Sequence, residues 1–107
     1  MIRFRDLAPE FAEELAALLV AEDEPGLAEQ ILSAEIVARC PCEDELCASF
    51  YTAPLPVGGY GPGYDGLQLG PITWGGGVHL DVEDGRLMHV EVLYNPEFRR
   101  RLRRVLP

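Results

Sequence analysis

The N-terminal third of the chain places apolar residues with the period of an α-helix. Between residues 9 and 23, apolar side chains recur every three or four positions and share one helical face: Phe11, Leu15, Leu18 and Leu19. The Pro25-Gly26 pair interrupts this pattern, and a shorter apolar series then predicts a second helix. The sequence therefore predicts a helical hairpin over residues 9–33.

From residue 35 the chain changes to short runs of β-branched and aromatic residues. The runs 36–40 and 47–52 flank an acidic, turn-like connection over residues 41–46. This arrangement predicts a β-hairpin with a six-residue connection. The hairpin opens a β-rich region that extends over residues 35–93.

The segment 78–92 alternates most regularly, and Asp84-Gly85 at its centre is typical of a hairpin turn. A two-residue loop would set Leu80 opposite His89 and mix the two faces. A three-residue loop with Gly85 in a bulge instead sets His79 opposite His89. We expect the three-residue loop because it gives one buried face, made of Val78, Leu80, Val82, Met88, Val90 and Val92.

A final helix is predicted over residues 96–106, with Asn95 as its N-cap and Pro96 in its first turn. A narrow apolar stripe follows it: Phe98, Leu102 and Val105. Together the elements predict a single α+β domain over residues 1–107. In it, a mostly antiparallel sheet of about four or five strands carries the helical hairpin and the C-terminal helix. A chain of 107 residues has room for one such core.

Charge distinguishes the C-terminus from the rest of the chain. Acidic residues outnumber basic ones by 18 to 9, and the net charge of −9 argues against nucleic acid as a partner. Five of the nine arginines lie in the final helix. We expect Arg99, Arg100 and Arg103 to contact an acidic protein partner or, in a homodimer, a second copy of the chain. The alternatives are a solvated helix and docking on the protein's own acidic body.

Two features bear on location. No apolar run approaches the ~18 residues of a membrane span, and the N-terminus lacks the apolar segment of a signal peptide. The abundant alanine, glycine, proline and arginine are typical of GC-rich bacterial genomes. We therefore expect a cytoplasmic bacterial protein that does not bind membranes.

Residues 54–77 are rich in glycine and proline, which indicates a loop. Short strands are expected over 67–69 and 72–74. The aromatic residues of this stretch argue for partial packing and make it a second expected contact surface: Tyr60, Tyr64 and Trp74.

Residues 61–66 of the same stretch match the G-x-G-x-x-G pattern of phosphate-binding loops. That chemistry needs a following helix whose N-terminus holds the phosphate, and the sequence predicts no helix there. We therefore exclude a phosphate-binding loop.

The spacing Cys40-x-Cys42-x4-Cys47 offers three soft ligands at one end of a predicted hairpin. Thiolates bind Zn²⁺ well, and a fourth ligand would come from a histidine or a carboxylate. The alternatives are reduced cysteines that fill small positions and a disulfide between Cys40 and Cys47 across the hairpin. The acidic residues 43–45 would raise the thiol pKa values, which argues against a reactive nucleophile.

The outer face of the 78–92 hairpin offers a second set of ligands: His79, Asp81, His89 and Glu91. Two imidazoles and two carboxylates suit Zn²⁺, Mn²⁺ or Fe²⁺. The alternative is the ordinary polar face of a half-buried sheet, on which the predicted register also places Leu87 and Leu93.

Two stretches resemble a family of small bacterial proteins that has no established function. They are the cysteine segment 39–51 and the hairpin 80–87 with the strand that follows it over 90–93. The family pattern has a glycine after its second cysteine, where this chain has Glu43. The resemblance implies no activity, cofactor or catalytic residue.

No catalytic arrangement of side chains emerges from the sequence. We therefore expect a non-enzymatic binding or interaction module. The alternative is a small metal-binding protein, with either a structural zinc ion on Cys40, Cys42 and Cys47 or a metal-dependent hydrolase site at His79 and His89.

Overall fold

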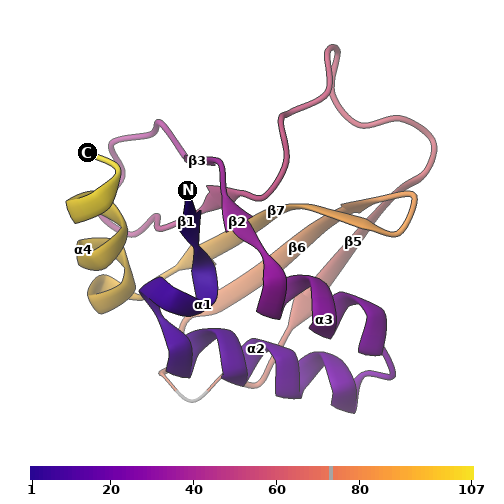
Figure 1. The fold of residues 1–107 in the computed structure, drawn as a ribbon, viewed down its shortest axis with the longest axis horizontal. Coiled ribbons are helices and arrows are strands. Elements are labelled where there is room, and N and C mark those ends of the chain that lie inside the picture. Colours follow the sequence, from indigo (N-terminus) through magenta and orange to yellow (C-terminus); the bar gives the residue numbers. More distant parts are fainter. Residues whose placement is uncertain (73) are drawn as a thin grey trace.

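The computed structural model describes residues 1–72 and 74–107, and it confirms an α+β fold (Figure 1). Its main sheet is antiparallel, with the strand order β3-β4-β7-β6-β5, and β1 and β2 form a separate two-stranded sheet. In chain order the elements are β1 (Ile2–Arg3), α1 (Phe4–Leu7), α2 (Pro9–Ala21), α3 (Pro25–Ser33), β2 (Glu35–Ile36), β3 (Ala38–Arg39), β4 (Phe50–Tyr51), β5 (Tyr64–Leu69), β6 (Gly77–Glu83), β7 (Arg86–Leu93) and α4 (Pro96–Val105).

Helices α1, α2 and α3 cover one face of the sheet, and α4 lies at its end (Figure 1). The predicted helical hairpin and the C-terminal helix are therefore confirmed, the latter with its cap, because the Phe98 N–H donates to Asn95 Oδ1 over 3.1 Å. The apolar pattern did not predict α1 or β1, since elements of four and two residues are too short to show a period. No helix in the described part of the chain is long and apolar enough to cross a membrane.

Four phenylalanines join the helices to the sheet at the centre of the core. The ring of Phe4 in α1 lies 4.9 Å from Phe50 in β4 and 5.6 Å from Phe98 in α4, and Phe11 lies 5.1 Å from Phe98. Edge-to-face and tilted pairs at these distances add to the free energy of burial. The cluster fixes the apolar side of α4 against the body of the protein.

The register of the β6–β7 hairpin differs from the predicted one. Asp84 and Gly85 have φ angles of 50° and 79° and form a two-residue turn, so that Glu83 pairs with Arg86. A bulge follows, and from there on Asp81 faces His89 and His79 faces Glu91. The prediction that His79 faces His89 is therefore wrong.

The physical reason lies in how the strands align their faces. A turn with two positive φ angles matches the right-handed twist of the strands, and the bulge absorbs the extra residue that would otherwise mix the faces. The predicted buried residues are all buried. Leu87, which the prediction placed outside, is buried as well, with 3% of its surface exposed.

The first hairpin is confirmed with shorter strands. Ala38 pairs with Tyr51, and the Cys40 N–H donates to the Ser49 carbonyl over 2.9 Å. Cys40 therefore lies opposite Ser49 rather than opposite Cys47. The three cysteines, all of which the structure describes, are free thiols.

The glycine-rich stretch contains more sheet than the sequence predicts. Strand β5 pairs with β6 over six residues, from Tyr64 to Leu69, where three were expected. It starts inside the G-x-G-x-x-G run, so a strand and not a helix follows, as expected. Ile72 and Trp74 lie outside any strand, and position 73 of the predicted strand 72–74 is outside the described residues.

Candidate metal centre

The segment between β3 and β4 gathers the three cysteines. One sulfur atom from each of Cys40, Cys42 and Cys47 lies within 4.8 Å of the other two. Within residues 1–72 and 74–107 they are the only histidine, cysteine or acidic side chains grouped in this way. A Zn–S bond of about 2.3 Å in a tetrahedral site separates sulfur atoms by about 3.8 Å. The cluster therefore needs to contract by no more than about 1 Å to hold a zinc ion.

Local hydrogen bonds give this segment its shape. The Leu46 N–H donates to Asp44 Oδ1 over 2.9 Å, and the Cys47 N–H donates to the Asp44 carbonyl over 3.2 Å. Aspartate favours such turns because its side chain accepts from the backbone two residues on. The Tyr94 N–H then donates to the Leu46 carbonyl over 3.0 Å, which ties the turn to the end of β7.

Ser49 supports the most buried of the three thiols. Cys47 is buried, and its sulfur lies 3.3 Å from the Ser49 hydroxyl, which also accepts from the Val92 N–H over 3.0 Å. A hydroxyl can rotate and donate to a thiolate once the cysteine has lost its proton. Cys40 and Cys42 are half-buried, so these two residues are partly accessible to solvent.

The thiols differ in acidity. Burial raises the pKa of Cys40 to about 11. A backbone hydrogen bond from Asp44 lowers the pKa of Cys42, and hydrogen bonds with Cys47 and Cys40 lower it further. The expectation that the acidic residues raise the thiol pKa values is wrong for Cys42, because the N–H of Asp44 outweighs its charge. Metal binding must therefore displace a proton from Cys40.

Arginines hold the backbone of all three cysteines. Arg39 Nη1 donates to the Cys40 carbonyl over 2.8 Å. From α4, Arg103 Nη2 donates to the Cys42 carbonyl over 3.0 Å and Arg99 Nε to the Cys47 carbonyl over 3.2 Å. Docking of this helix on the body of the protein is one of the alternatives that its charge pattern leaves open, whereas nothing in the sequence indicates a role for Arg39 or Ser49. Arg99 and Arg103 are four residues apart in a helix, which is the one sequence signal for a shared target.

The second set of expected ligands forms a network around Asp81. Tyr64 donates its hydroxyl to Asp81 Oδ1 over 2.7 Å, His79 Nε2 lies 3.3 Å from the same oxygen, and His89 Nδ1 lies 2.9 Å from Oδ2. The hydrogen bond to Asp81 raises the pKa of Tyr64 to about 12. Glu91 faces His79 across the strands and is exposed. The carboxylate of Asp81 thus already faces two imidazoles and one hydroxyl.

Gly66 makes this network sterically feasible. It lies opposite Asp81 in β5, and a Cβ atom there would come within 2.8 Å of the Tyr64 hydroxyl and 2.9 Å of His79 Cε1. A glycine inside a strand often marks such a close approach. The Tyr64 hydroxyl and the His79 ring can therefore both lie over Gly66 and reach Asp81.

No protein-family model matches the chain, and no curated protein or solved structure matches it significantly. The resemblance to a bacterial family stays a prediction. The structure confirms one part of its basis, because the cysteine segment brings its three thiols close together.

The residues that we expected to contact a partner differ in how far they are engaged within their own chain. Arg99 and Arg103 contact their own chain, whereas Arg100 is exposed. Tyr60 stacks on Tyr64 with ring centroids 5.1 Å apart. A homodimer or an acidic partner at the arginine-rich helix stays a prediction.

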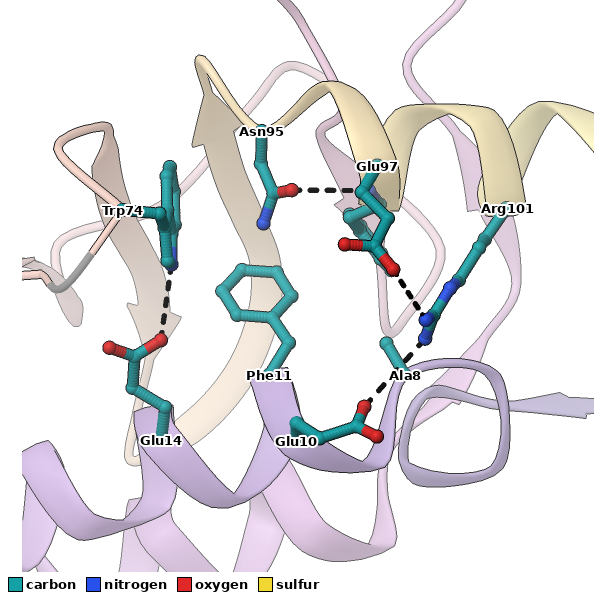
Figure 2. A pocket seen from close by; sticks show the side chains of 9 residues that line it. Ala8, Glu10, Phe11, Glu14, Trp74, Asn95, Glu97 and Arg101 are labelled. Atoms are coloured by element: carbon teal, nitrogen blue, oxygen red, sulfur yellow. Dashed lines mark hydrogen bonds and ion pairs between the residues drawn. The ribbon is translucent and has the colours of Figure 1, made fainter.

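Trp74 lines a surface pocket of about 260 Å³ between α2 and α4 (Figure 2). Its indole packs edge-on against Phe11, with ring centroids 5.6 Å apart, and donates to Glu14 over 3.1 Å. Arg101 extends between Glu97 and Glu10, with its nitrogens 2.7 Å and 3.8 Å from their oxygens (Figure 2). The polar groups of this pocket therefore pair with one another and fasten α4 to α2.

Proposed function

We propose that this chain is a zinc-binding protein, in which Cys40, Cys42 and Cys47 hold one Zn²⁺ ion. The observation that carries the proposal is the grouping of the three sulfur atoms within 4.8 Å. Three thiolates are soft ligands that suit Zn²⁺, and the partial exposure of Cys40 and Cys42 leaves the fourth position to water or to a ligand from outside the chain.

The ion would have a structural role within a non-enzymatic binding module. The cysteine segment joins β3 to β4, contacts the end of β7 and lies beside α4. Residues 40–47 contain only one large apolar side chain, Leu46. A metal ion would therefore hold this segment in place, as buried apolar contacts hold helices α1, α2 and α3 against the sheet. Structural zinc sites stabilise small domains in this way.

The test is metal content per chain, measured by native mass spectrometry on reduced protein purified without chelators or a histidine tag. We expect one zinc ion per chain, protection of all three thiols in a thiol titration, and loss of the ion in Cys42→Ser and Cys47→Ser variants. The matched control is the double variant His79→Ala/His89→Ala, which we expect to keep its zinc.

A protein with no metal and three reactive thiols would overturn the proposal. Zinc that survives the cysteine substitutions but is lost from the histidine variant would move the site to the outer face of the sheet. That result would favour the metal-dependent alternative at His79 and His89.

A further inference from the structure

The arginines beside the cysteine cluster come from two elements, strand β3 and helix α4. Arg99 and Arg103 lie one turn apart on α4, on the side that faces the cysteine segment, while Phe98 and Leu102 face the core. Arg39 comes from β3 and reaches both the Cys40 carbonyl and the end of α4. Each of the three ligand residues therefore has a guanidinium on its carbonyl oxygen.

We propose that Arg39, Arg99 and Arg103 are positioning residues of the metal site, and that zinc binding and the docking of α4 stabilise each other through them. This inference rests on the proposed binding of zinc by the three cysteines. The docking of α4 regulates the zinc affinity of the site, and zinc in turn regulates the docking of α4.

The charges of the metal site favour guanidinium groups beside it. Three thiolates and one Zn²⁺ carry a net charge of −1, and the carbonyl oxygens of the same residues add partial negative charge. Guanidinium groups that donate to these carbonyls offset both, and hydrogen bonds from an ionised donor are stronger than neutral ones. The acidic side chains nearby are more exposed, as Glu43 shows, since its carboxylate is 4.0 Å from Arg103 with 88% of the side chain exposed.

The geometry of the ligand residues depends on the same arginines. Residues next to metal ligands fix the orientation of those ligands, and changing them commonly weakens metal binding. Here Arg99 and Arg103 fix the two cysteines that lie 52 and 61 residues from them in the chain, so the positions of Cys47 and Cys42 depend on where α4 lies. If α4 moves, the carbonyl oxygens of these two ligand residues lose their hydrogen-bond donors.

Arg39 extends the coupling to the last turn of the helix. Its Nε donates to the carbonyl of Leu106, the C-cap residue, over 2.7 Å, and its Nη2 donates to the Pro107 carbonyl. A cation at this position complements the negative end of the helix dipole. One side chain therefore contacts both the first ligand residue and the end of α4.

Coupling of this kind is reciprocal. If docked α4 raises the affinity for zinc by a given factor, zinc must favour docked α4 by the same factor. Phe98 and Leu102 hold the first turns of α4 in the core without metal. We therefore expect zinc to act most strongly on the last turn, around Arg103 and Leu106.

The experiment compares two double variants that remove the same charge. Arg99→Gln/Arg103→Gln removes two supports of the cysteine segment, and Arg100→Gln/Arg104→Gln removes two exposed arginines of the same helix. Zinc affinity is measured by competition with a chromophoric chelator. We expect the first variant to bind zinc about 10-fold more weakly or worse, and the second to stay within about twofold of the wild type.

Two further readouts separate positioning from folding. Cobalt substitution reports the geometry of the thiolate ligands, and we expect an altered Co²⁺ spectrum in Arg99→Gln/Arg103→Gln alone. Hydrogen exchange reports α4 directly. We expect zinc to slow exchange in the last turn of wild-type α4 and to do so much less in this variant.

Equal zinc affinity and equal exchange in the two double variants would overturn the inference while leaving zinc binding in place. A wild-type protein without zinc would overturn the proposed function itself, so the two failures are distinct. If Arg99→Gln/Arg103→Gln does not fold, Arg103→Lys replaces it, because lysine keeps the charge but not the planar fork. An unchanged zinc affinity and Co²⁺ spectrum in Arg103→Lys would then count against the inference.

Discussion

The two clusters of potential ligands differ in what satisfies their polar atoms. On the outer face of the sheet, Asp81 accepts from Tyr64 and faces both histidines, so the cluster satisfies itself. In the cysteine segment, the backbone is satisfied from outside by arginines, and the sulfur atoms mostly face one another. A metal ion must break the hydrogen bonds of a carboxylate in the first cluster, whereas in the second it would displace thiol protons and draw together sulfur atoms that already lie within 4.8 Å of one another.

The largest expected effect is that of zinc on stability. When free zinc exceeds the dissociation constant a thousandfold, binding to the native state alone raises the free energy of unfolding by about 4 kcal/mol. Thermal unfolding followed by circular dichroism, with chelator and then with zinc in a reducing buffer, measures this effect. The Cys42→Ser variant should show almost no response. If it responds as strongly as the wild type, the cysteine segment is not the metal site and the contrast between the clusters fails.

The next effect tests whether the outer cluster is structural. Asp81→Ala removes the acceptor that faces Tyr64, His79 and His89, and we expect a loss of about 1–3 kcal/mol because the His89 side chain, of which only 13% is exposed, is left without a partner. Urea unfolding measures the loss. The matched control is Glu91→Ala, an exposed carboxylate on the same face, which should change stability by no more than about 0.5 kcal/mol. Equal losses in the two variants would mean that Asp81 does not hold this face together.

The outer face of the β6–β7 hairpin could be predicted from the sequence only in part. The alternation over 78–92 predicts the buried face correctly because burial follows the two-residue period of a strand. It does not predict the register, since Leu87 and Met88 sit at a bulge and the pattern does not show where a strand takes up an extra residue. The network of side chains around Asp81 depends on that bulge, because the bulge places His89 opposite Asp81. Its contacts therefore could not be derived from the spacing of the histidines.

The cysteine segment was predictable to a different extent. The spacing of Cys40, Cys42 and Cys47 predicts that they can cluster, because a short hairpin connection cannot separate them widely. It does not predict the contacts of Arg99 and Arg103, which lie more than fifty residues further along the chain. Those contacts depend on how Phe98 docks α4 in the core, and this is a property of the whole fold.

Alkaline pH should affect the outer cluster through Tyr64. Because its hydrogen bond to Asp81 raises the folded-state pKa from 10.0 to about 12, the native state holds this proton more tightly than the unfolded state does. The contribution of Tyr64 to stability is therefore complete below pH 10 and is lost as the pH rises towards 12. Phenolate absorbance measures the shift. The Tyr64→Phe variant should lose the most alkaline step of the titration, and an unchanged curve would contradict the hydrogen bond to Asp81.

The smallest expected effect on stability is that of Gly66→Ala. Two contributions to it oppose each other: the lower conformational entropy of the unfolded chain and the loss of hydrogen bonds around Asp81. Alanine restricts the unfolded chain, which stabilises a compatible site by about 0.4–1 kcal/mol. Its Cβ would also displace the Tyr64 hydroxyl and His79, which costs about 0.5–1.5 kcal/mol per lost hydrogen bond. For Gly66→Ala we therefore expect a net change in stability within about 1 kcal/mol.

The pKa of Tyr64 decides between these two contributions, since it reports the hydrogen bond and not the strand. It should fall back towards 10.0 in Gly66→Ala, whatever the stability does. The control is Gly77→Ala, where the nearest atom to the new Cβ is Gln68 Nε2 at 3.9 Å, so the Tyr64 titration should not move. If Tyr64 keeps its high pKa in Gly66→Ala, the tyrosine reaches Asp81 by another path. The hydrogen bonds around Asp81 would then not require a glycine at position 66.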